Sequence, residues 1–284
     1  MTEPSRTPAE SSARFRTLLI CQADCALDLE GLARWLASFS NLTGIVVLHG
    51  TKRQLWRRVR REVRRVGWLR FLDVLAFRLY YKLALEWRDA AWEEKTLAGL
   101  REQYPPLTGQ TRILHAESPN ANAVREFIGE LAPDIMIARC KTLLKPEIFQ
   151  LPAVGTFVMH PGVCPEYRNA HGCFWALARN DLERVGVTLL KIDAGVDTGP
   201  VYGDYRTPFD EQSESHIVIQ HRMVIDNLPD LEDRLNEIHA GRATAISTAG
   251  RASEVWGHPW LTAYFKWRLN AWQRRRRANC AHLS

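Results

Sequence analysis

Paired cysteines are missing from this sequence. Its six cysteines are scattered along 284 residues, without a Cys-x-x-Cys pair or a regular spacing, so neither a zinc site nor a disulfide framework is predicted. They are Cys21, Cys25, Cys140, Cys164, Cys173 and Cys280. Because isolated cysteines are typical of a reducing compartment, we expect a cytoplasmic protein that uses no metal.

Long apolar runs are missing as well. Residues 1–15 are polar and lack the apolar centre of a secretory signal, so we expect a short disordered tail there. The most apolar helical stretch, 67–87, is interrupted by Arg70, Asp73 and Lys82, which excludes a transmembrane helix. Hydrophobic residues make up 46% and charged residues 25%, and these values indicate a globular chain rather than a disordered one.

The net charge of +6 is unevenly distributed. Much of the arginine lies in two blocks, at 51–70 and at 272–277, while the middle of the chain is closer to balance. Such blocks contact phosphates, anionic lipid headgroups or acidic proteins, and the plain alternative is a solvated helix face.

Apolar runs and helical periodicities alternate along most of the chain. Residues 16–23 and 43–50 read as strands around a helix at 29–39, which implies a parallel right-handed unit. The pattern is then interrupted by an amphipathic, arginine-rich helical segment over about 51–103. Alternation resumes with strands at 111–118, 133–140, 154–159 and 185–192 and a helix at 120–131.

This order predicts an α/β, Rossmann-like fold with a mostly parallel sheet flanked by helices. We expect a catalytic domain over 16–210 that contains the helical insertion after its second strand. A helical C-terminal extension, 211–284, would follow and end in a basic aromatic tail.

Two polar loops stand out at strand ends. One follows the strand at 154–159 within VMHPGVCPEYRNAHGCFWAL (158–177), and the other follows the strand at 185–192 within DAGVDTG (193–199). Prolines make the first loop stiff and irregular. Ligands of open parallel sheets bind at the carboxyl ends of the strands, so we expect both loops to meet in one cleft.

These loops carry a resemblance. AVGTFVMHPGVCPEYRNAHGCFWALARND, followed by GVTLLKIDAGVDTGPVYGDYRTPFDE, resembles the folate-dependent formyltransferases, a family that includes glycinamide ribonucleotide, methionyl-tRNA and sugar-nucleotide amine formyltransferases. The resemblance runs from about residue 133 to 211. It implies a Rossmann-like enzyme that moves a formyl group from formyl-tetrahydrofolate to an amine.

The family's catalytic set is an Asn, a His two places later, and an Asp in the later loop. His160 and Asp197 match, whereas Val158 stands at the position of the Asn. Attack of an amine on the formyl carbon creates an oxyanion and a cationic nitrogen, which require a donor and a proton route. We therefore expect Asn169 or His171 to replace the missing donor, the alternative being that either caps the following helix.

The resemblance also implies binding residues. Backbone and apolar groups would hold the pterin from one wall formed by Lys141, Thr142, Leu143 and Leu144, and from another formed by Asp193, Ala194, Gly195 and Val196. Tyr167 and Arg168 are candidates for the acceptor, Arg168 either for a phosphate or carboxylate or for pairing within the loop.

Three function classes remain open. The first is formylation of a small-molecule amine such as an amino sugar nucleotide, and the second is methionyl-tRNA formylation, which the helical pattern after residue 210 disfavours. The third is a non-catalytic folate-binding relative, for which Val158 is the main support. Segments 67–87 and 260–277 alternate aromatic and basic residues, which suits an anionic membrane surface or, alternatively, packing of Trp and Tyr on the domain.

Overall fold

A seven-stranded sheet organises the molecule, which the computed structural model describes over residues 14–281. The strand order is β3-β2-β1-β4-β5-β7-β8. Its strands are β1 (Arg16–Gln22), β2 (Asn41–Leu48), β3 (Arg112–Ala116), β4 (Ile135–Arg139), β5 (Gly155–Pro161), β7 (Val187–Lys191) and β8 (Val201–Tyr205). The first five of these in the order pair in parallel, whereas β5–β7 and β7–β8 are antiparallel. The predicted α/β class with a mostly parallel sheet is confirmed.

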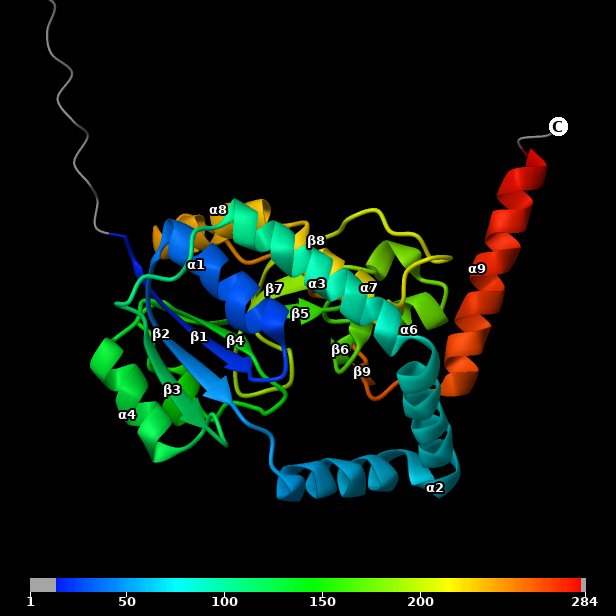
Figure 1. The fold of residues 1–284 in the computed structure, drawn as a ribbon, viewed down its shortest axis with the longest axis horizontal. Coiled ribbons are helices and arrows are strands. Elements are labelled where there is room, and N and C mark those ends of the chain that lie inside the picture. The colour runs from blue at the N-terminus through cyan, green and yellow to red at the C-terminus, as the bar shows by residue number, and fades with distance from the viewer. Residues whose placement is uncertain (1–13, 282–284) are drawn as a thin grey trace, which may run out of the picture.

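Helices cover both faces of the sheet (Figure 1). One face is covered by α4 (Asn122–Leu131) and α5 (Pro146–Phe149). The other face is covered by the π-helical turn at Leu27–Leu32, α1 (Ala33–Phe39), α6 (Gly172–Ala178), α7 (His216–Ile225) and α8 (Leu228–His239). Alternate residues of each strand enter the two cores because side chains alternate across a strand: Leu18 and Ile20 lie on the α4 face, and Leu19 and Cys21 lie on the α1 face.

The interval 51–103 is helical. It forms α2 (Lys52–Ala84), which bends at Gly67 with a φ of 78°, and α3 (Glu86–Gln103). Thr51 begins α2 with a capping box shared with Gln54. Leu97 and Leu100 of α3 are buried in the main core, so this part of the predicted insertion packs as part of the domain.

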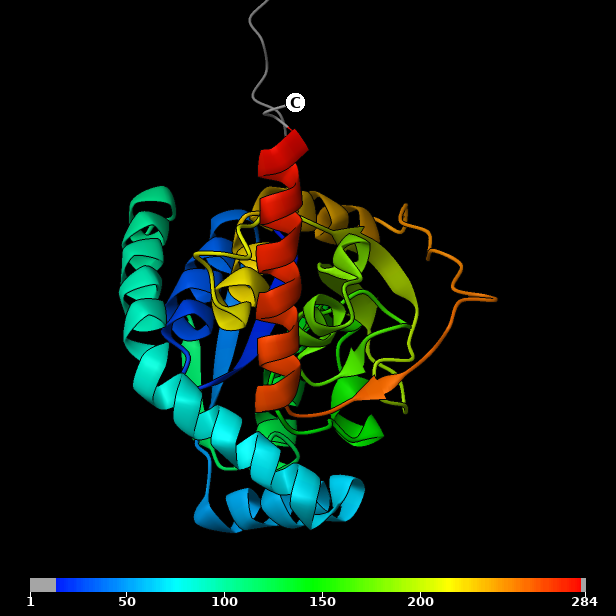
Figure 2. The same cartoon turned by 90° about the vertical axis from the view of Figure 1, so that its right-hand side faces the viewer.

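The polypeptide after residue 210 packs back on the sheet. Helix α7 contacts β5 and β7, and α9 (Leu261–Ala281) lies against α2 and α6 (Figure 2). Between α8 and α9, β9 (Val255–Trp256) pairs with β6 (Arg168–Asn169) in a separate two-stranded sheet. The extension is therefore joined to the catalytic region by strands as well as by helices.

Helix α9 has both an inner and an outer face. Tyr264, Trp267 and Ala271 are buried, and Trp267 donates from Nε1 to Glu211 Oε1 at 2.6 Å. Phe265 and Trp272 are about half exposed. Of the two alternatives for 260–277, packing on the domain is therefore correct for one face of the helix.

The prediction of a disordered tail falls largely on residues 1–13, which lie outside the described residues. The last two residues of that predicted segment are described, and Phe15 is buried against Phe39 and His239, with ring centroids 6.0 and 4.5 Å away. The ordered domain thus includes Phe15.

The burial of α9 can be tested by comparing two tryptophans of one helix. Trp267→Ala should lower the free energy of unfolding by about 3–5 kcal/mol, because it removes a fully buried indole. Trp272→Ala, on the outer face, should change it by no more than about 0.5 kcal/mol. Urea unfolding followed by far-UV circular dichroism measures both, and equal effects would contradict the packing of α9.

Candidate functional site

His160 lies near the carboxyl end of β5, where the structure corrects the expectation that it belongs to a loop. Its ring is 4% exposed. Nε2 lies 2.8 Å from the carbonyl oxygen of Tyr167, and Nδ1 lies 3.5 Å from Asp197 Oδ2. A carbonyl only accepts, so Nε2 carries a proton and Nδ1 is the nitrogen left for proton exchange. Nδ1 is therefore the ring nitrogen that faces the Asp197 carboxylate.

The loop that carries Asp197 reaches His160 by an unexpected path. Both loops were expected to leave the same edge of a parallel sheet, but β7 runs antiparallel to β5, so its carboxyl end lies at the opposite edge, beside Phe157. Residues 193–199 instead return across the sheet face on which Val158 pairs with Leu190. Asp197 itself adopts the left-handed backbone conformation, with a φ of 50°. The prediction that the two loops meet is correct. They meet because residues 193–199 fold back across the sheet, and not because both loops leave the same edge.

Hydrogen bonds within the 193–199 loop and from Arg168 hold it in place. Asp193 Oδ1 accepts from the Gly195 backbone N–H at 2.9 Å and from the Thr198 hydroxyl at 2.7 Å. Arg168 donates from Nη1 to the Val196 carbonyl at 3.0 Å. Of the two roles considered for Arg168, pairing within the site is thus the one that the geometry supplies.

Asn169 is brought to the pair, whereas His171 is not. The Asn169 backbone N–H donates to Asp197 Oδ2 at 2.7 Å, and its side-chain amide donates to the Trp256 carbonyl. His171 instead neighbours His216 and His258, with ring centroids 6.3 and 5.7 Å away. Its ring stands at the N-terminal end of α6 without a side-chain capping bond.

Some of the predicted cofactor-binding residues line one cavity, and others do not. A cavity beside the pair is lined by Ala138, Cys140, Thr142, Leu143, Leu144, Val158, Leu190, Ile192, Asp193, Gly195 and Asp197. It joins most of both predicted walls, but Lys141 pairs with Asp24 at 3.6 Å and is not in its lining, and neither are Ala194 and Val196. Burial raises the pKa of the Cys140 thiol to about 11, so this thiol is uncharged at neutral pH.

Tyr167 contributes its backbone rather than its side chain. The carbonyl anchors His160, while the phenol donates to Asp181 Oδ2 at 2.8 Å and the ring stacks on Trp256 at 5.8 Å. Burial raises the pKa of this phenol. The side chain is 3% exposed, so it holds the loop rather than facing the cavity.

Sequence reasoning missed a buried ion pair. Arg139 at the end of β4 donates from Nε to Asp28 Oδ1 at 3.0 Å and from Nη1 to the Met159 carbonyl at 2.7 Å, next to His160. Burial alone would lower the pKa of Arg139, but Asp28 raises it. No local sequence pattern connects Arg139 with Asp28, which lies 111 positions away.

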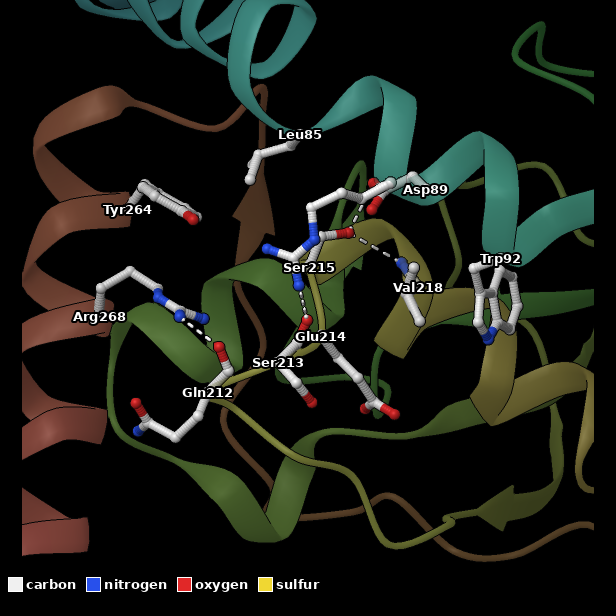
Figure 3. A pocket seen from close by; sticks show the side chains of 11 residues that line it. Leu85, Asp89, Trp92, Gln212, Ser213, Glu214, Ser215, Val218, Tyr264 and Arg268 are labelled. Carbon is white, nitrogen blue, oxygen red and sulfur yellow. Dashed lines mark hydrogen bonds between the residues drawn. The ribbon is translucent and has the colours of Figure 1, made fainter.

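A second cavity, of about 320 Å³, lies between α3, the segment 212–218 and α9 (Figure 3). Asp89 Oδ2 accepts from the Ser215 hydroxyl at 2.6 Å and from the Tyr81 hydroxyl at 2.9 Å, and burial raises the pKa of this carboxyl. Arg88 donates to the Ser213 carbonyl, and Arg268 donates to the Gln212 carbonyl. These charged groups therefore hold the 212–218 segment between the helices.

Within residues 14–281, no group of three His, Cys, Asp or Glu side chains is arranged to hold a metal ion. Over the same residues, no helix is both long and apolar enough to cross a bilayer.

Comparisons with known proteins agree on one family. Residues 93–226 match the family model described as formyl transferase. This match begins inside α3 and continues through α7, past the expected boundary at residue 210. The chain is 30% identical over 136 residues to a methionyl-tRNA formyltransferase of Thermus thermophilus, a match that covers 44% of each chain. The matched part of the chain thus spans less than half the length of this curated relative.

Solved structures share the fold. A sugar N-formyltransferase of a Shewanella species superposes with a TM-score of 0.52 at 12% identity, covering 90% of this chain and 87% of that one. Glycinamide ribonucleotide transformylase 1 of Symbiobacterium toebii gives the same TM-score and identity, covering 89% and 99%. These likenesses concern the architecture of the sheet and its helices.

The three neighbouring histidines His171, His216 and His258 predict that the fold loses stability in acid. Burial lowers the pKa of His216 to about 3, and it also lowers the pKa of His171 and of His258. The folded protein therefore binds fewer protons than the unfolded chain between about pH 6.5 and pH 3, so stability is present above this window and is lost as pH falls through it.

For His216 alone, the loss between pH 7 and pH 5 should be about 2 kcal/mol. His216→Phe should flatten the pH dependence of urea unfolding by that amount, whatever its effect at pH 7. An unchanged slope in His216→Phe would refute the assignment.

Proposed function

The chain carries a formyl transferase domain over residues 93–226, and on this premise we propose that it transfers a formyl group from formyl-tetrahydrofolate to a primary amine. The observation that carries the proposal is the arrangement of His160, with Nε2 fixed on a carbonyl and Nδ1 facing Asp197 beside a cavity. An imidazole so held can stabilise the oxyanion and pass on the amine proton.

The donor would occupy the cavity between β4 and the 193–199 loop. Leu143, Leu144 and Leu190 offer apolar walls for a flat heterocycle, and the backbone of the loop offers hydrogen-bonding groups at its rim. Formyl-tetrahydrofolate supplies the formyl carbon there, and this chain positions the proton-transfer groups beside it.

Asn169 supports the pair without replacing the missing donor directly. One N–H of its amide is held by the Trp256 carbonyl, and its backbone N–H orients Asp197. Val158 lines the cavity on the same face as His160, two residues along β5. We propose that the oxyanion donor is an N–H at Nδ1 of His160, formed when this nitrogen takes up the amine proton beside Asp197, and that the site works without the usual amide.

A small-molecule amine is the acceptor class that we propose. Described residues 211–281 form helices α7, α8 and α9 with the short strand β9, and they contain no barrel that would contact a tRNA. The match to methionyl-tRNA formyltransferases keeps tRNA as the second candidate, and the arginines of α2 are the observation that favours it.

The direct test is an assay of formyl-tetrahydrofolate consumption with a panel of amines. Sugar nucleotides, amino acids and methionyl-tRNA are incubated in turn, and mass spectrometry detects a product heavier by one formyl group. We expect product only with a small-molecule amine. Product with charged tRNA would support the second candidate, and a blank across the panel with retained folate binding would support a non-catalytic relative.

If His160 and Asp197 act as a catalytic pair, replacing either residue should lower turnover. His160→Gln and Asp197→Asn should each lower kcat at least about a hundredfold with little change in KM for the donor. Asp197→Asn keeps an oxygen for the Asn169 N–H, so its loss reports the charge rather than the loop. His115→Gln should retain full activity, and near-normal turnover in either site variant would exclude the pair.

Val158→Asn tests whether the site needs the usual amide. If His160 is sufficient, this variant should raise kcat by less than about threefold, because the oxyanion already has its donor. A gain of a hundredfold or more, the worth of one such donor, would show that the donor is missing in this chain.

A further inference from the structure

A stripe of large apolar side chains runs in water along α2 and the start of α3. Buried Phe71, Val74 and Phe77 face the domain, where Phe77 meets Phe174 and Tyr264 with centroids 5.7 and 5.4 Å away. The exposed stripe consists of Trp68, Leu69, Leu72, Leu75, Leu79, Leu83 and Trp87. Their spacing of three or four residues places most of them on one side of the helix.

This exposure is unusual for a water-soluble surface. Leu69 is 87% exposed, Leu83 is 72% exposed and Trp68 is 71% exposed. Single exposed apolar residues are common, but a contiguous row of them marks a binding surface. The proposed formyl transfer uses none of these side chains.

The first half of α2 supplies a strong positive charge next to this stripe. Residues 52–66 contain eight basic residues and one acidic residue, Glu62. Glu62 is buried and pairs with Arg65 at 2.6 Å. Within the described residues, no carboxylate lies within ion-pair distance of Arg53, Arg57, Arg60, Arg61 and Arg64, all of which are exposed.

Helix α9 adds a second surface of the same kind. Phe265, Leu269 and Trp272 are exposed at helical spacing, and Arg276 lies over the Trp272 ring at 4.6 Å. Tyr80 of α2 contacts Phe265 with centroids 5.5 Å apart, so the two helices meet near their apolar outer faces. Both halves of α2 and the start of α9 border the same end of the molecule (Figures 1 and 2).

We propose that α2, with α9 beside it, docks the protein on an anionic lipid surface. Leucine and tryptophan would enter the boundary between headgroups and acyl chains, and the arginines would contact the phosphates. A second copy of this chain fits the surface less well, because two such helices would bring their arginine rows together. A nucleic acid would use the arginines but leave the leucines in water.

Helix α2 borders the ends of the parallel strands, so docking through α2 would orient the site. Its first turn lies at the carboxyl edge of the parallel strands, where Gln54 donates to the Glu117 carbonyl at 2.7 Å. Arg65 packs against Gly257, near His258 and His171. Binding would therefore hold the edge at which β4 and β5 end close to the lipid headgroups.

The experiment is co-sedimentation of the full chain with vesicles. Phosphatidylcholine vesicles are compared with vesicles containing one-third phosphatidylglycerol, at about 150 mM salt, where exposed charges are screened beyond about 8 Å. We expect binding to the anionic vesicles alone. The combined variant Leu69→Gln, Leu72→Gln, Leu79→Gln and Leu83→Gln should bind at least tenfold more weakly with an unchanged melting temperature, since all four side chains are exposed.

Two further variants separate charge from apolar contact. Arg57→Gln, Arg60→Gln, Arg61→Gln and Arg64→Gln should also weaken binding at least tenfold and should flatten its salt dependence. Ile113→Gln with Ile246→Gln is the matched control, since these residues are 54% and 46% exposed on other parts of the surface. This control should bind like the original chain.

Four results would overturn the proposal. The first is failure of the original chain to bind anionic vesicles, and the second is equal binding by the leucine variant. The third is a dimer in sedimentation velocity that the leucine variant converts to a monomer, which would assign the stripe to a second copy. Tight tRNA binding that only the arginine variant abolishes would assign the arginines to RNA. None of these measurements depends on formyl transfer, so the two proposals fail or stand separately.

Discussion

The pairing of β5 with β7 is the constraint on which the candidate site depends. Antiparallel pairing sets Val158 opposite Leu190 and His160 opposite Thr188. The Thr188 hydroxyl is buried and bonds to Gly162, Cys164 and Asp204, which fixes the start of the proline-rich loop. With β5 held in this register, the Tyr167 carbonyl and Asp197 meet the two nitrogens of one imidazole from opposite sides.

Positive φ angles occur in both loops that meet at that imidazole. Asn169, His171 and Asp197 all have positive φ angles, which residues other than glycine seldom adopt. Asn169 is held by Asp197 and Trp256, and Asp197 by Asn169, so two strained residues stabilise each other. The short pairing of β6 with β9 links this strained loop to the segment before α9. The C-terminal region thereby takes part in shaping the site.

Helices α2 and α3, which follow β2, have apolar residues on both their inner and their outer faces. Their inner faces complete the core through Phe77, Leu97 and Leu100. Their outer faces present leucine, tryptophan and arginine to solvent. A helix that only covered the sheet would carry polar residues outside, as amphipathic surface helices do. The exposed leucines and tryptophans of α2 therefore indicate that this surface binds a ligand.

The sequence alone determined six of the seven strands of the main sheet, most of the helices and the two polar loops, because apolar periodicity and proline are local signals. Strand β8 and the short strands β6 and β9 were not predicted. It also placed Asp197 in the later loop, whereas it placed His160 in the loop after a strand and the structure extends β5 through this residue. The direction of β7 was decided only by tertiary structure, since strand pairing depends on hydrogen bonds between distant segments. The same is true of His171, which turns to His216 and His258, and of Asp28, which neutralises Arg139. Periodicity likewise showed that α2 is amphipathic, but which of its apolar residues stay in water depends on where α9 and α6 pack against it.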